Sequence, residues 1–117
     1  MARAQDTVEP NALSAAVFHI LLSLADEDRH GYGVMQEVEQ RTGGRVRLGP
    51  GTLYGALKRM REDGWVEELE SEEGGERRRM YRLTSTGRKV ARQEAQRLEE
   101  LVVSAHAKRL LSSARLA

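Results

Sequence analysis

The chain of 117 residues contains no cysteine, and aromatic residues make up only 4% of it. Without cysteine there is no disulfide framework, no thiolate metal site and no thiol nucleophile. With so few aromatic side chains, the core must be built from leucine, valine, alanine, isoleucine and methionine. Such a core is typical of packed helices, and it disfavours an all-β fold.

Long apolar runs are missing as well. The longest, Leu13 to Ala25, is interrupted by polar residues and is shorter than the roughly 20 residues that a membrane-spanning helix needs. The first ten residues combine Arg3 with acidic and polar side chains, where a signal peptide would have an apolar segment. The sequence therefore predicts a cytoplasmic protein without a membrane partner.

Histidine is scarce, with three residues in the chain. His19, His30 and His106 fall on three separate predicted elements, and none has the spacing to a carboxylate of the zinc motif His-Glu-x-x-His. No set of side chains suggests a catalytic or metal site. We therefore expect a protein that is not an enzyme and that uses no cofactor and no metal.

The net charge of +1 hides a strong segregation of charge along the chain. Residues 44–64 hold five basic and two acidic side chains, residues 65–76 hold six acidic and no basic ones, and residues 77–92 hold seven basic and no acidic ones. The two basic segments can form a patch that attracts phosphate, because local charge dominates within a Debye length of about 8 Å. Alternatively, the acidic and basic segments are adjacent strands that neutralise each other.

Hydrophobic periodicity predicts three short helices in the first half of the chain. Apolar residues over 13–24 recur with the spacing of one helix face. Further apolar residues lie outside this face, so we expect the first helix to be covered on more than one side. A second helix opens near Gly31 and ends at Gly43 and Gly44. A third has Pro50 in its first turn and Gly64 just after its end, where a left-handed backbone is favoured.

A hairpin and one long helix complete the expected order. Strand-type residues at 65–70 and 77–84 are separated by residues 71–76, whose Gly74-Gly75 pair suits a turn. Thr84 or Ser85 can cap the final helix. We thus expect a mainly α fold with a two-stranded β wing. This is the order of a winged helix-turn-helix, followed by a C-terminal helix.

The last helix, expected over residues 86–111, carries an apolar seam with the 4-3 spacing of a coiled coil. A helix that follows a hairpin has few partners left in its own chain. We therefore expect the seam to form the interface of a homodimer, through Leu98, Leu101, Val102 and Ala105. The alternative is that the helix folds back over the first helix of its own chain.

Four short motifs occur in a familiar order and spacing: HGYG at 30–33, PGTLYGAL at 50–57, EDGWV at 62–66 and YRLTSTGR at 81–88. Between about residues 13 and 101, the chain resembles the PadR family of bacterial transcriptional regulators, in its shorter branch with a single C-terminal dimerisation helix. The expected organisation is a DNA-binding domain at 11–85, a dimerisation helix at 86–111, and flexible ends at 1–10 and 112–117.

The resemblance implies a homodimeric repressor that binds double-stranded DNA at a pseudo-palindromic operator. Because the family includes sensors of phenolic acids and of planar drug-like molecules, it also allows for a small aromatic effector. A winged-helix adaptor that binds other proteins, without specific DNA binding, is the alternative.

The third helix supplies most of the candidate DNA contacts. Its expected apolar stripe is formed by Leu53, Ala56, Leu57 and Met60, at offsets 0, 3, 4 and 7. The residues on the opposite side are Thr52, Tyr54, Gly55, Lys58, Arg59 and Arg61. Hydroxyl groups bond base edges or phosphates, and Lys and Arg neutralise phosphates or read guanine. The family role in DNA contact fits the first three residues best. For the three cations, an ordinary solvated helix face is the alternative.

Two other elements add candidates. Tyr32, at the start of the second helix, either binds a phosphate or packs on the core. Glutamates surround the wing tip and repel phosphate, so the wing contacts are expected on the return strand, from Arg77, Arg78 and Arg79. Since side chains alternate between the faces of a strand, these three cannot all point the same way.

Overall fold

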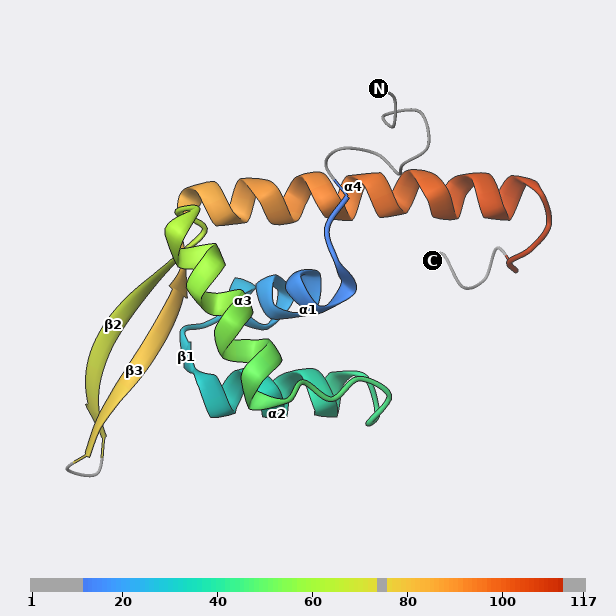
Figure 1. Ribbon diagram of the computed structural model, residues 1–117. Coiled ribbons are helices and arrows are strands. Elements are labelled where there is room, and N and C mark those ends of the chain that lie inside the picture. The colour runs from blue at the N-terminus through green and yellow to red at the C-terminus, as the bar shows by residue number, and fades with distance from the viewer. Residues whose placement is uncertain (1–11, 74–75, 113–117) are drawn as a thin grey trace, which may run out of the picture. The chain divides into compact units, whose positions relative to one another are not determined.

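The computed structural model describes residues 12–73 and 76–112. Its elements are α1 (Ala15–Ala25), β1 (Arg29–His30), α2 (Gly31–Arg41), α3 (Pro50–Glu62), β2 (Val66–Glu73), β3 (Glu76–Leu83) and α4 (Ser85–Ala107). Residues 13–91 form one compact unit, and residues from 92 onward belong to a second. In the first unit, α1, α2 and α3 contact one another, and the hairpin of β2 and β3 (the wing) contacts α1 and α3 (Figure 1). The predicted order of three helices, hairpin and long helix is confirmed.

Helices α2 and α3 end where the sequence places their stop signals. Gly43 and Gly44 follow α2 with φ values of 62° and 83°, and Gly64 follows α3 with a φ of 79°. Residues other than glycine rarely adopt this left-handed backbone, so each glycine favours the end of its helix. At the end of α3, the Trp65 N–H donates to the Met60 carbonyl at 2.8 Å and closes the last turn.

One apolar core joins the three helices to the hairpin. It consists of Ile20, Leu21, Leu24, Val34, Val38, Leu53, Ala56, Leu57, Met60, Val66, Tyr81 and Leu83. The α3 members lie at the predicted offsets, and burying a large apolar side chain contributes about 1.5 to 3 kcal/mol. The core therefore fixes which side of α3 faces outward.

The sheet has one strand more than the sequence predicted. β1 pairs antiparallel with β3, Arg29 opposite Tyr81 and His30 opposite Met80, so the strand order is β1-β3-β2. The hairpin strands are also longer than expected. The expected strand ends at residues 70 and 77 are wrong, because residues 71–73 belong to β2 and residue 76 belongs to β3. The glycine pair expected to form the turn lies outside the described residues.

α4 begins with one of the two predicted caps, since Thr84 Oγ1 accepts the Gly87 N–H at 3.0 Å. The helix ends at Ala107, before the expected end at residue 111, and Arg109 then has a φ of 67°. Among the residues that the structure describes, no helix is long and apolar enough to cross a membrane. The ends predicted to be flexible lie outside the described residues, apart from residue 112.

Candidate nucleic-acid interface

The exposed side of α3 carries all six residues selected from the sequence. Thr52, Tyr54, Gly55, Lys58, Arg59 and Arg61 are exposed, opposite the buried apolar stripe of the helix. The prediction of the two faces of α3 is thus confirmed. That these six residues bind DNA stays a prediction.

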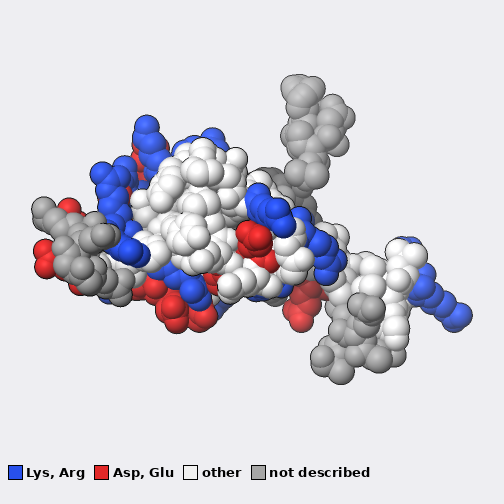
Figure 2. All heavy atoms as spheres, turned by 90° about the horizontal axis from the view of Figure 1, so that it is seen from below, with Lys and Arg blue, Asp and Glu red and all other residues white. Residues whose placement is uncertain are grey.

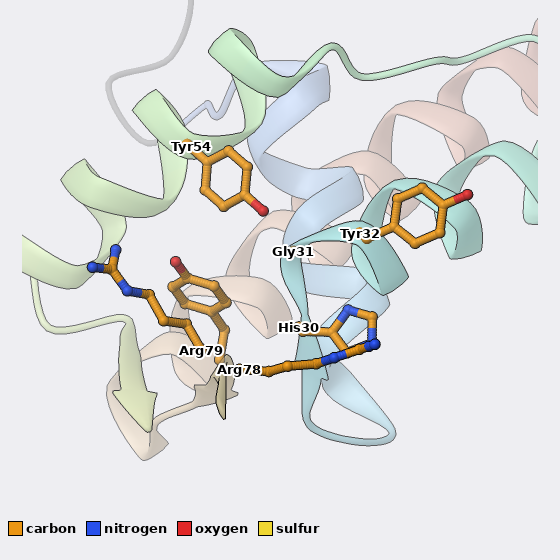
Figure 3. Close-up of a pocket in the computed structure, with 7 residues that line it drawn as sticks. His30, Gly31, Tyr32, Tyr54, Arg78 and Arg79 are labelled. Atoms are coloured by element: carbon orange, nitrogen blue, oxygen red, sulfur yellow. The ribbon is translucent and has the colours of Figure 1, made fainter. Parts of the chain in front are cut away.

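Tyr54 also connects α3 to the start of α2. Its ring lies over Gly31, where a Cβ atom would come within 2.6 Å of the Tyr54 Cζ atom. Figure 3 shows the Tyr54 hydroxyl directed toward Gly31. Only glycine leaves room for this approach, so the half-exposed tyrosine packs closely on the start of α2.

Tyr54 forms one wall of a hollow of about 530 Å³, which we call the α2–β3 hollow. It is lined by His30, Gly31, Tyr32, Tyr54, Arg78, Arg79 and Tyr81. It brings together four predicted contact residues from three elements, namely Tyr32, Tyr54, Arg78 and Arg79. Tyr32 is 59% exposed, which excludes the alternative that it packs on the core.

Of the three arginines predicted as wing contacts, the two whose side chains are described reach different partners, as the alternation of a strand requires. Arg78 extends toward His30, with its Nη1 atom 3.0 Å from the His30 Nε2 atom. Arg79 extends toward α3 and Glu68, with its Nε atom 3.1 Å from Glu68 Oε2. Figure 3 shows these opposite directions. The side chain of Arg77 lies outside the described part of the chain.

Glu68 on β2 is a member of the site that the sequence did not single out. Its carboxylate pairs with Arg61 on α3 and with Arg79 on β3, and its own side chain is only 20% exposed. One carboxylate therefore connects the exposed side of α3 to the wing. Around it lies a second hollow of about 210 Å³, lined by Tyr54, Leu57, Lys58, Arg61, Glu68, Arg79 and Tyr81.

Tyr81 closes the floor of both hollows and is 4% exposed. Burial raises the pKa of its hydroxyl above the usual value of about 10, and the negative charge of Glu68 raises this pKa further. Tyr54 adds to the rise, whereas Arg79 and Arg61 oppose it. Tyr81 is therefore a neutral hydroxyl at physiological pH.

The acidic and basic segments lie side by side in the wing, as one of the two interpretations of the charge pattern predicted. The register places Glu67 opposite Arg82 and Glu70 opposite Arg79. In Figure 2, Lys and Arg atoms are interspersed with Asp and Glu atoms, so the face in view is not one continuous basic field. An anion that approaches this face therefore meets local groups, such as those of the α2–β3 hollow, and no extended basic surface.

His30 is the second functional candidate that sequence reasoning left unassigned. Its Nδ1 atom accepts the Gly33 N–H at 3.2 Å and caps α2. In the sequence, its position directly before a predicted helix could have indicated this capping role. Within residues 12–73 and 76–112, no three His, Asp or Glu side chains gather as metal ligands.

The family model of the transcriptional regulator PadR-like family matches residues 20–93. The transcriptional regulator Rv3488 of Mycobacterium tuberculosis is 40% identical over 88 residues, which are 75% of this chain and 79% of that protein. An uncharacterized 37.1 kDa protein in transposon TN4556 of Streptomyces fradiae is 43% identical over 82 residues, which are 70% of this chain and 22% of that protein.

Solved structures agree with these relatives. A PadR family transcription regulator from Clostridium difficile R20291 has a TM-score of 0.72 and 26% identity, over 80% of this chain and 97% of that one. Bacillus subtilis PadR, solved in complex with operator DNA, has a TM-score of 0.61 and 20% identity, over 68% of this chain and 45% of that one, which shows a shared fold. Rv3488 and the Clostridium difficile protein are both transcriptional regulators. The chain therefore belongs to the PadR-like family of transcriptional regulators, with a winged helix-turn-helix followed by a C-terminal helix.

Proposed function

We propose that the protein is a homodimeric repressor that binds a pseudo-palindromic operator and is released by a small aromatic effector. The observation that carries the DNA-binding part is the exposed side of α3, where hydroxyl groups and cations lie next to the α2–β3 hollow. The similar fold of Bacillus subtilis PadR, a protein that binds operator DNA, supports it.

In this proposal α3 enters the major groove. Thr52, Tyr54 and Gly55, near its N-terminus, approach the base edges, while Lys58, Arg59 and Arg61 contact phosphates or guanine. The wing reaches the flanking backbone through Arg77, Arg78 and Arg79. Tyr32, exposed at the start of α2, contacts a phosphate beside α3.

The homodimer is proposed to form through α4. Leu101 is 51% exposed, and Leu98, Val102 and Ala105 are partly exposed on the same helix. Burying each large side chain contributes roughly 1.5 to 3 kcal/mol, and a two-fold axis buries each of them twice. A dimer presents two α3 helices to half-sites about 34 Å apart, or a multiple of one helical turn.

The effector is proposed to bind between α1 and the α4 helix of the partner subunit, and to change the spacing of the two α3 helices. Leu22 of α1 is 38% exposed and is available for such an interface. A ligand shifts a population only by its differential affinity, so a 100-fold preference for one dimer geometry supplies about 2.7 kcal/mol. That is enough to release a repressor from a marginally occupied site.

The test is a fluorescence anisotropy titration with the DNA that precedes the protein's own gene, compared with a scrambled duplex of equal length. We expect tighter binding to the pseudo-palindrome than to one half-site, and an affinity that falls steeply between 50 and 200 mM salt, as about one counterion is released per phosphate contact. If the gene-proximal duplex and the scrambled duplex bound with equal affinity, and salt did not change that affinity, the protein-binding adaptor would be favoured.

A further inference from the structure

The ring of His30 lies between two hydrogen-bond donors. Gly33 N–H donates to its Nδ1 atom at 3.2 Å, and Arg78 Nη1 lies 3.0 Å from its Nε2 atom. A neutral imidazole has one nitrogen that accepts and one that donates, and a guanidinium group only donates. The ring therefore cannot accept a hydrogen bond from both neighbours.

Of the two possible hydrogen bonds to the His30 ring, the one from Gly33 N–H is the more costly to lose. The first N–H groups of a helix have no partner within the helix, and α2 begins at the buried Gly31, where water is a poor substitute. Arg78 is exposed and can donate to solvent. With Nδ1 accepting the cap bond, Nε2 carries the ring proton. His30 Nε2–H and Arg78 Nη1–H are then two donors whose nitrogen atoms lie 3.0 Å apart, and one acceptor oxygen can bridge them.

The surroundings favour an anionic acceptor. Among the described residues, the lining of the α2–β3 hollow includes two arginines and three tyrosines and no carboxylate. A phosphate oxygen bonded by a charged donor and a neutral one gains charge-assisted hydrogen bonds, which are about twice as strong as neutral ones. The hollow also lies between β3 of the wing and Tyr54 of α3, two of the elements proposed to contact DNA (Figure 3).

We propose that His30 Nε2–H and Arg78 Nη1–H together bind one oxygen of an operator backbone phosphate at the mouth of this hollow. The inference rests on the proposed function and adds to it a contact residue, His30, and a defined chemical role for Arg78. The cap bond fixes the tautomer and orientation of the ring, so the start of α2 is organised for the phosphate before DNA arrives.

The variant that isolates this role is His30→Asn. Asparagine is among the best N-cap residues, so its side-chain oxygen replaces Nδ1 in the cap of α2, while nothing replaces Nε2–H. Arg78→Gln, on an exposed strand position, removes the other donor without touching the cap. His19→Asn is the matched control, because its ring also lies beside an arginine, Arg41, at 3.2 Å, but outside the hollow.

In operator titrations, we expect His30→Asn and Arg78→Gln each to weaken binding about tenfold per half-site. The double variant should lose little more than either single one, because both donors hold the same oxygen. His19→Asn should bind as the wild type does. Arg78→Gln alone should also reduce the salt dependence by about one counterion per half-site, since His30 contributes a hydrogen bond and no net charge.

A scan with methylphosphonate linkages locates the phosphate. At one backbone position of each half-site, the uncharged linkage should weaken the wild type about tenfold and leave the affinity of His30→Asn unchanged. Nitrogen chemical shifts of His30 in the free protein should report the Nε2–H tautomer. Three results would overturn the proposal. They are an Nδ1–H tautomer of His30, wild-type operator affinity in His30→Asn, or a loss of affinity from His30→Asn that adds to the loss from the methylphosphonate linkage at every backbone position.

Two further outcomes identify the source of the error. If inorganic phosphate shifts the His30 ring signals but no methylphosphonate position couples to His30, the hollow takes a free anion, and the assignment to the operator backbone is wrong. If the wild type binds no operator while remaining folded, the proposed function fails, and this inference fails with it.

Discussion

Glu68→Gln tests whether the ion pairs between the wing and α3 orient Arg61 and Arg79 for DNA binding. The change keeps the size of the side chain and removes the charge that pairs with Arg61 and Arg79. The side chains of Arg61 and Arg79 are 46% and 72% exposed, so each ion pair is well solvated and contributes about 0.2 to 1 kcal/mol to the stability of the fold. We therefore expect a folded protein with a small decrease in thermal stability.

The effect on DNA binding should be larger than the effect on stability. Without Glu68, two cations per subunit become available to phosphates, and each additional phosphate contact increases the salt slope by about 0.9. Affinity for a scrambled duplex at low salt should rise, by about three- to tenfold. Affinity for the operator should rise less, because Arg79 and Arg61 are no longer held in one geometry, so the ratio of specific to non-specific binding falls.

The assay is anisotropy with both duplexes between 50 and 200 mM salt. Glu67→Gln is the matched control, since it removes the same charge from the adjacent position, where the carboxylate is 4.0 Å from Arg82 and 52% exposed. If Glu68→Gln left the salt slope and the affinity for scrambled DNA unchanged, or if Glu67→Gln had the same effect, the role assigned to Glu68 would be wrong.

Three other changes test the packing, the dimer and the buried hydroxyl. Gly31→Ala places a methyl group against Tyr54 and should lower the free energy of unfolding by about 1 to 3 kcal/mol in denaturant titrations, with much of the loss recovered when Tyr54 is also made alanine. Leu98→Asp should give monomers in sedimentation, and a dimer that persists at micromolar concentration would move the interface elsewhere. Because the pKa of Tyr81 is raised in the folded state, its hydroxyl stabilises the fold fully below about pH 10 and loses this effect as pH rises through the raised value. Stability measured from pH 9 upward should therefore fall less steeply in Tyr81→Phe.

The features that the sequence predicted well are those that depend on neighbouring residues. The spacing of Leu53, Leu57 and Met60 determines the buried side of α3, and so also the exposed one. Gly43, Gly44 and Gly64 mark helix ends because left-handed backbone is accessible to glycine without strain. Both signals lie within one or two helical turns, so no knowledge of the tertiary fold is needed to use them.

The features that were missed depend on distant segments. β1 has two residues, too few for an alternating pattern, and exists only because β3 pairs with it. Glu68 is one of six glutamates between residues 65 and 76, and only the strand register and the position of α3 place its carboxylate between two arginines. The partner of His30 is Arg78, 48 positions away in the chain.

The central claim is that the exposed side of α3 reads operator DNA, and Tyr54→Ala tests it most directly. Leu57→Ala, on the buried side of the same helix, is the comparison, and it should destabilise the fold by about 2 to 5 kcal/mol. In operator titrations with thermal melts on the same samples, Tyr54→Ala should weaken specific binding by about 1 to 3 kcal/mol and leave the protein folded. Unchanged operator affinity in a folded Tyr54→Ala protein would contradict the account.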